Sequence, residues 1–254
     1  MMEQSILLAV LIFVMALLYS SVGHGGASGY LAAFALMGVA VAVMKPSALV
    51  LNVLVSTIAS VRFYQAGWFS WRIFLPFAAA SIPLAYIGGG VTLHASLHKQ
   101  IVGVVLVYAA FRLWGFAQGE KQAEATNVEI VTKPVPLVWA VVWGAGLGFL
   151  SGLVGVGGGI FLSPLLLLAG WASVQQASSV AAAFILVNSL AGLAGTWSNV
   201  AALPEGIYLW GAAAVCGGLI GAELGSRKLA GVILRRVLAI VLLVASYKLF
   251  FVGL

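Results

Sequence analysis

Two glycine clusters interrupt an otherwise apolar chain at matching places in its two halves. The first is Gly23-His24-Gly25-Gly26, and the second, displaced by 132 residues, is Gly155-Val156-Gly157-Gly158-Gly159. Each cluster follows one apolar segment and opens another. Because glycine costs a helix roughly 1 kcal/mol relative to alanine, a cluster of glycines indicates that the helix is interrupted there. The pattern therefore predicts broken or re-entrant helices at two equivalent positions.

Composition assigns the chain to the membrane proteins. Of its 254 residues, 63% are hydrophobic and only 7% are charged, and the mean hydropathy is +1.15. A soluble domain carries about 25% charged residues, so this chain has too few to cover a surface that faces water. Long apolar stretches recur along its whole length. We therefore expect an all-α polytopic membrane protein.

Apolar segments fall into two groups of five. The first group covers residues 5–22, 28–44, 47–61, 73–93 and 100–117, and the second covers 137–154, 160–172, 177–196, 206–224 and 232–252. Between the groups lies the only long polar stretch, in which we expect no structure. The predicted organisation is a first transmembrane repeat (1–117), a polar linker (118–136) and a second transmembrane repeat (137–254).

The two halves resemble each other and are expected to be inverted repeats. A shift of 132 residues places Gly89 over Gly221 as well as one glycine cluster over the other. Because five segments are an odd number, the second half must enter the membrane in the opposite sense. If the loop between Arg62 and Arg72 faces the cytoplasm, nine of the 12 Lys and Arg residues lie inside, as the positive-inside rule requires. Whether segments one, two, six and seven cross the bilayer or dip in and return stays open.

Glycine clusters of this kind can bind an anion. Without side chains, successive backbone N–H groups can turn toward a common point, and an adjoining helix start adds unpaired N–H donors. A repeated break in an apolar chain is also typical of the substrate site of a transporter. The alternative is close helix packing, for which small residues are equally suited. The candidate binding residues are Gly23, His24, Gly25 and Gly26 in the first cluster, and Gly155, Gly157, Gly158 and Gly159 in the second.

Polar side chains recur on the segments that follow the clusters. Asn52, Ser56 and Ser60 share one helix face, and Asn188 and Thr196 are eight residues apart on another helix. In lipid such strips either join helices or line a path. We add Asn52, Ser56, Asn188 and Thr196 to the candidate site, with the two amides as preferred ligands because an amide donates two hydrogen bonds. His24 could donate to an anion, carry a coupling proton, or be a plain polar loop residue.

Charged residues narrow the functional class. Glu223 is the only carboxylate within an apolar segment, and we expect Arg227 to pair with it. A cation transporter normally carries buried acidic residues, so the solute is expected to be an anion. Lys45 is expected to extend to the membrane interface. The basic excess is attributed to loop orientation, and nucleic-acid binding is not expected.

Catalytic and metal-binding patterns are not found in the sequence. His94 and His98 are four residues apart, but this spacing alone does not indicate a metal site. We find no nucleophile with partner residues in a known catalytic motif. Neither enzymatic activity nor a cofactor or metal is therefore expected.

The run from Gly155 to Leu166, which ends Ile160-Phe161-Leu162-Ser163-Pro164-Leu165-Leu166, resembles the glycine-rich signature of the sulfite exporter TauE/SafE family. The resemblance extends over nearly the whole chain. It implies transport of sulfite, an organosulfonate or a related small anion across the cytoplasmic membrane of a prokaryote. The first cluster departs from the pattern at Ala27 and lacks a proline equivalent to Pro164. Transport of another small anion and a non-transporting assembly role remain alternatives, and the oligomeric state, a homo-oligomer included, stays open.

Overall fold

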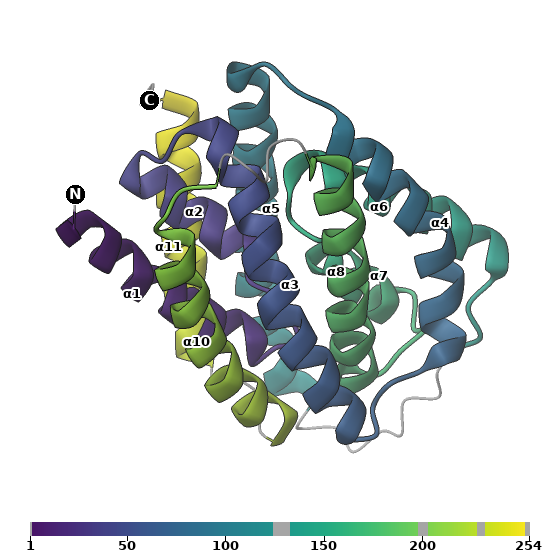
Figure 1. Cartoon of the computed structure of the whole chain (residues 1–254). Helices are drawn as coiled ribbons and strands as arrows, with labels where there is room; N and C mark the ends of the chain where they lie inside the picture. The colour runs from purple at the N-terminus through teal and green to yellow at the C-terminus, as the bar shows by residue number, and fades with distance from the viewer. Residues whose placement is uncertain (1, 124–132, 198–202, 228–231, 252–254) are drawn as a thin grey trace.

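The computed structural model describes residues 2–123, 133–197, 203–227 and 232–251, and these ranges contain helices and connecting loops but no strand (Figure 1). The predicted all-α class is confirmed. Helices of the first half are α1 (Met2–Ser20), α2 (Ala27–Met37), α3 (Val41–Gln65), α4 (Trp71–Gly90) and α5 (Ala95–Ala123). Those of the second half are α6 (Leu137–Val154), α7 (Gly159–Leu168), α8 (Val174–Gly195), α10 (Ile207–Arg227) and α11 (Val232–Phe251).

Each predicted apolar segment corresponds to one of these helices. The match is closest for α6, which begins and ends where the hydropathy predicts. The largest difference is at α5, which continues to Ala123 and so enters the stretch expected to be an unstructured linker. Glu, Lys, Gln and Ala in this stretch are good helix formers, which explains the extension. Residues 124–132 of the predicted linker lie outside the described residues.

Helix length separates membrane spans from shorter elements. Five helices are long and apolar enough to cross a membrane, namely Ala42–Gln65, Trp71–Gly90, Leu137–Val154, Val174–Gly195 and Ile207–Gly225. By contrast, α2 and α7 have 11 and 10 residues. At 1.5 Å per residue each is about 15 Å long, roughly half the hydrocarbon core. Neither α2 nor α7 can cross the membrane by itself.

Helices from the two halves of the chain interleave. In Figure 1, α3 and α8 lie side by side in the middle, with the α1–α10 pair on one side and the α4–α6 pair on the other. In the same way α11 packs against α5 and α2. Each of these pairs joins a helix of the first half to one of the second. The turns that carry the two glycine clusters are thereby held close to the central α3–α8 pair.

In each of the two outer helix pairs, a row of three glycines spaced by four residues allows the helices to pack closely. In α6 the row is Gly144, Gly148 and Gly152, which lie against the carbonyl oxygens of Phe77, Ser81 and Ala85 in α4. In α10 it is Gly217, Gly221 and Gly225, which lie against those of Phe13 and Leu17 in α1 and of Ser21 directly after it. A side chain at any of these glycines would collide with the backbone of the partner helix. Close packing therefore explains these glycines, as small residues at membrane helix interfaces commonly do.

Candidate functional site

The two glycine clusters meet around a pair of side chains from the central helices. A Cβ placed on Gly25 would lie 2.6 Å from Oδ1 of Asn52 in α3 and 2.9 Å from Cγ2 of Ile185 in α8. A Cβ placed on Gly157 would lie 2.7 Å from the same Ile185 carbon and 2.8 Å from Nδ2 of Asn52. Gly25 and Gly157, from opposite halves of the chain, therefore both lie directly against Asn52 and Ile185.

The Asn52 amide bridges the two halves in a defined orientation. The residue is fully buried, and its Nδ2 donates to the carbonyl oxygen of Val156 at 3.2 Å and to Oγ of Ser189 at 3.3 Å. A backbone carbonyl only accepts, so the amide nitrogen must face Val156. The carbonyl Oδ1 consequently faces Gly25, and among the described residues it has no hydrogen-bond partner.

Backbone donors at the clusters are also without partners. The N–H groups of Gly25, Gly26, Gly157 and Gly158 are buried, and no group in the described part of the chain accepts a hydrogen bond from them. Left-handed backbone at Gly26 (φ 98°) and Gly158 (φ 78°) turns the chain into α2 and α7, which both begin one residue later. Buried backbone N–H groups are nearly always paired, so four unpaired ones in two facing turns indicate a place for an acceptor.

Two carbonyl groups of the turns, in contrast, accept hydrogen bonds from buried side chains. The Tyr30 hydroxyl donates to the carbonyl oxygen of Gly25 at 2.8 Å, and Asn52 donates to that of Val156. Their acceptor character is thereby neutralised by donors from inside the protein. The unpaired N–H groups of the two turns have the donor character that suits a negatively charged group.

His24 connects the two short helices. Its Nδ1 lies 2.9 Å from the carbonyl oxygen of Val22, and its Nε2 lies 3.1 Å from Oγ of Ser163 in α7. The ring is almost fully buried, with 9% of its surface exposed. His24 is therefore packed within the structure, and it links the first glycine cluster to the helix that the second one opens.

The remaining candidates are distributed around this centre. Gly23 lies against Ser178 at the start of α8, Gly155 against Lys45 at the start of α3, and Gly159 against Ile185. The other three are polar residues of the central helices whose described bonds stay within one helix. Ser56 donates to the carbonyl oxygen of Asn52, Asn188 Nδ2 donates to that of Phe184 at 2.8 Å, and Thr196 is the C-terminal cap of α8.

Sequence reasoning did not find Ile185 and Ser189, which complete the centre. A signal was available, since Ile185 follows Asn52 by 133 residues and Ser189 follows Ser56 by 133. This shift differs by one from the 132 that aligns the glycines. One additional residue in the second half of the chain, between its glycine cluster and Ile185, accounts for this difference.

The position of the Lys45 side chain differs from the one expected from the sequence. Its side chain is buried, and Nζ donates to the carbonyl oxygens of Gly89 at 2.8 Å and of Gly88 and Val91 at 3.3 Å. These carbonyls belong to the last turn of α4 and to its C-terminal cap, where a positive charge is stabilising. The prediction that Lys45 extends to the membrane interface was wrong, because the end of a neighbouring helix provides a closer set of acceptors.

The intramembrane carboxylate is neutralised by the other half of the chain. Oε2 of Glu223 in α10 lies 3.3 Å from Nη1 of Arg62 in α3. Both side chains are more than a third exposed. The side chain of Arg227, the partner expected from the sequence, lies outside the described residues.

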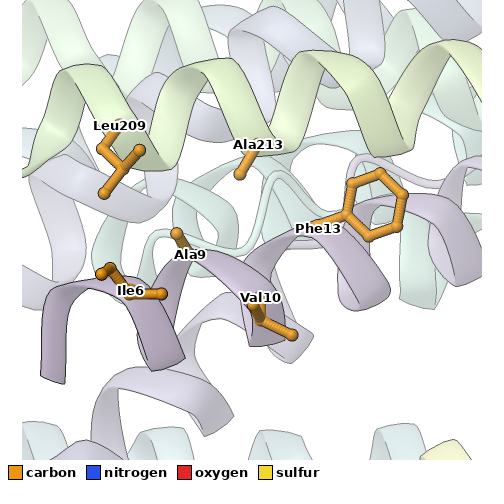
Figure 2. Close-up of a pocket in the computed structure, with 6 residues that line it drawn as sticks. All are labelled: Ile6, Ala9, Val10, Phe13, Leu209 and Ala213. Atoms are coloured by element: carbon orange, nitrogen blue, oxygen red, sulfur yellow. The ribbon is translucent and has the colours of Figure 1, made fainter. Parts of the chain in front are cut away.

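A surface pocket lies apart from the glycine clusters. It is bordered by α1 and α10 and lined entirely by apolar side chains (Figure 2), which are those of Ile6, Ala9, Val10, Phe13, Leu209 and Ala213. No polar group there could hold a charged solute. The pocket therefore does not belong to the candidate site.

Comparison with known proteins agrees with this architecture. The family model described as "Sulfite exporter TauE/SafE" matches residues 8–249. A Sinorhizobium fredii protein described as "Probable membrane transporter protein y4hK" is 39% identical over 246 residues, which are 97% of this chain and 98% of the relative. No solved structure matches the chain.

The fold defines a multi-pass helical membrane protein whose two halves meet at a pair of broken helices. The chain belongs to the sulfite exporter TauE/SafE family. It is a membrane transporter, as the family match and the full-length relative indicate.

Proposed function

We propose that the protein transports sulfite, or a related small sulfur oxyanion or organosulfonate, and holds it between the two glycine clusters. The anion is bound by the backbone N–H groups of the two turns. The observation that carries this proposal is the convergence of Gly25 and Gly157, from opposite halves of the chain, on one pair of side chains. Their unpaired, buried N–H groups supply the donors that an oxyanion requires.

Charge in the transmembrane region supports an anionic solute. The protein has no Asp, and within the five candidate spans Glu223 is the only acidic residue. Its carboxylate is paired with Arg62 and so is not available as a cation ligand. Transporters of cations usually place carboxylates on the solute pathway.

Movement of the solute is proposed to occur by alternating access between the two repeats. In the described conformation the clusters are buried, and Gly25 and Gly157 both lie directly against Asn52 and Ile185. Opening to one side of the membrane requires the α1–α2 turn to separate from α8, or the α6–α7 turn to separate from α3. Neither short helix spans the membrane, so each can move without shifting a complete membrane span.

Flux into proteoliposomes tests the proposal. Purified protein is reconstituted, and uptake of sulfite is compared with uptake of thiosulfate, methanesulfonate and chloride. We expect saturable uptake of at least one sulfur anion above that of protein-free vesicles. Absence of uptake of every sulfur anion by folded protein would refute the proposal, and saturable uptake of chloride alone would replace it with another small anion.

A pair of glycine variants links the flux to the site. Gly25→Ala places a methyl group against Asn52 and Ile185 and is expected to lower uptake at least about tenfold. Gly146→Ala in α6 places it in open space and should leave uptake unchanged. If Gly25→Ala changes only folding, and uptake per folded molecule is retained, the glycines serve packing and the site lies elsewhere.

A further inference from the structure

Besides its hydrogen-bond donors, the site contains an acceptor without a partner among the described residues, the side-chain oxygen of Asn52. Asn52 Oδ1 is buried and unpartnered within the described residues, and it is directed at the first glycine cluster, 2.6 Å from the place of a Cβ on Gly25. Its orientation cannot be reversed, since Nδ2 is bonded to the carbonyl oxygen of Val156 and to Ser189. A buried acceptor without a donor destabilises the protein, so such an atom is retained where something else supplies the donor.

Neighbouring side chains do not supply it. The Tyr30 hydroxyl donates to the carbonyl oxygen of Gly25, and the two ring nitrogens of His24 lie at Val22 and Ser163. Ile185, which also lies against Gly25, has no polar group in its side chain. Lys45, the nearest buried cation on the same helix, donates to three carbonyl oxygens at the end of α4.

The centre therefore combines several donors with one acceptor. Backbone N–H groups of the turns can donate hydrogen bonds to the oxygens of an anion, but none of them donates to Asn52 Oδ1. Sulfate and the sulfonate group have only acceptors, and each would place an oxygen lone pair or a methyl group against this carbonyl. An oxyanion that keeps one proton has both kinds of group.

We propose that Asn52 Oδ1 accepts a hydrogen bond from the solute itself, so that the site selects a singly charged oxyanion carrying its own hydroxyl. For a sulfur anion this is hydrogen sulfite. Asn52 is then the residue that distinguishes hydrogen sulfite from sulfate and from alkylsulfonates. This inference rests on the proposed function, because it assumes that the anion binds between the clusters.

Two probes of equal charge test the selection. Sulfite at mildly acidic pH is mainly hydrogen sulfite, and methanesulfonate has a methyl group in place of the hydroxyl. Dissociation constants for both are measured with the purified full-length chain at the same pH, so that the protonation of His24 is common to the two titrations. We expect hydrogen sulfite to bind about tenfold more tightly or better, as sites that pair a solute hydroxyl reject analogues without it.

Variants assign the preference to Asn52. Asn52→Leu keeps the branched shape of the side chain but removes the acceptor together with the Nδ2 donor. The ratio of the two dissociation constants should then fall toward one. Thr57→Val is the matched control, since Thr57 is exposed on the same helix and its hydroxyl donates to the carbonyl oxygen of Val53. This control should keep the ratio of the wild-type protein.

The outcomes separate the two proposals. Equal binding of both anions by the wild-type protein, or tighter binding of methanesulfonate, overturns the role of Asn52 and leaves anion transport intact. Binding of neither of these anions, nor of thiosulfate, by folded protein overturns the proposed function itself. Should Asn52→Leu fail to fold, the comparison of the two probes in the wild-type protein still decides the question.

Discussion

His24 and Ser163 are joined by a hydrogen bond of 3.1 Å between Nε2 of the imidazole and the serine hydroxyl. Nδ1 of His24 faces the carbonyl oxygen of Val22 and therefore carries a hydrogen. The Ser163 oxygen also lies 3.1 Å from the carbonyl oxygen of Gly159. When the ring is neutral, Nε2 accepts a hydrogen bond from the Ser163 hydroxyl. When the ring is protonated, Nε2 donates a hydrogen bond to the Ser163 oxygen, and the Ser163 hydroxyl donates to the carbonyl oxygen of Gly159. Protonation of His24 reverses this bond without breaking it.

This reversible bond predicts a role for His24 in proton coupling. His24→Gln keeps a polar side chain but cannot take up a proton, so uptake should lose its response to an imposed pH gradient. Exchange of labelled for unlabelled solute, which needs no net proton movement, should continue. Both rates are measured in the same proteoliposomes. An unchanged response of the variant to the pH gradient would assign His24 a structural role.

Gly157 is expected to be the glycine least tolerant of substitution in the second cluster. Gly157→Ala forces a side chain into left-handed backbone (φ 79°), and its Cβ would lie 2.7 Å from Ile185. The backbone strain costs about 1–2 kcal/mol, and the crowding displaces the residues between the clusters. We expect a lower unfolding temperature together with at least about tenfold weaker anion binding. Thermal unfolding and equilibrium binding in detergent measure the two effects.

Gly67→Ala separates backbone strain from crowding. Gly67 has the same φ of 79°, but no atom lies within 4 Å of a Cβ placed on it. This variant should be destabilised by the strain and should bind the anion as the wild-type protein does. If both variants lose stability and neither loses affinity, Gly157 is needed for folding and not for binding.

The helices and their interruptions could be predicted from the sequence because they depend on local properties. Long apolar runs need helical structure in lipid, and clustered glycines cannot continue a helix. The approach of Gly25 to Gly157 could not be predicted in this way. It depends on how α3 packs against α8, which no local pattern in either cluster encodes.

Individual residues show why the site was only partly foreseen. Asn52 was recognisable because a buried amide in an apolar helix needs a partner. Ile185 was not, since an apolar residue in an apolar helix gives no signal until its neighbours are known. Lys45 was misassigned because a lysine near a helix start suits both the membrane interface and the end of another helix.

Lys45 is predicted to stabilise the fold by capping α4. Lys45→Met keeps an unbranched side chain of nearly the same length but leaves the carbonyl groups of Gly88, Gly89 and Val91 without their donor. The expected loss is about 2 kcal/mol, from the charge at the helix end and the unpaired acceptors. Thermal unfolding in detergent measures it. Lys99→Met, in the partly exposed start of α5, is the control, and equal unfolding temperatures for the two variants would contradict the capping role.

His98 is predicted to make stability depend on pH. It lies in the first turn of α5, outside the five candidate spans, and burial and the charge of Lys45 lower its pKa to about 4 from 6.5. Between these values the unfolded chain binds a proton that the folded chain does not, so stability is retained above 6.5 and falls as the pH falls toward 4. At about 1.4 kcal/mol per pH unit, the full loss is about 3 kcal/mol.

His98→Leu should remove most of this loss of stability. The loss is measured as the difference between the unfolding temperatures at neutral and at mildly acidic pH. His94→Leu, at an exposed position, is the control and should keep the loss. If acid destabilises His98→Leu as much as the wild-type protein, the pH dependence arises at another group.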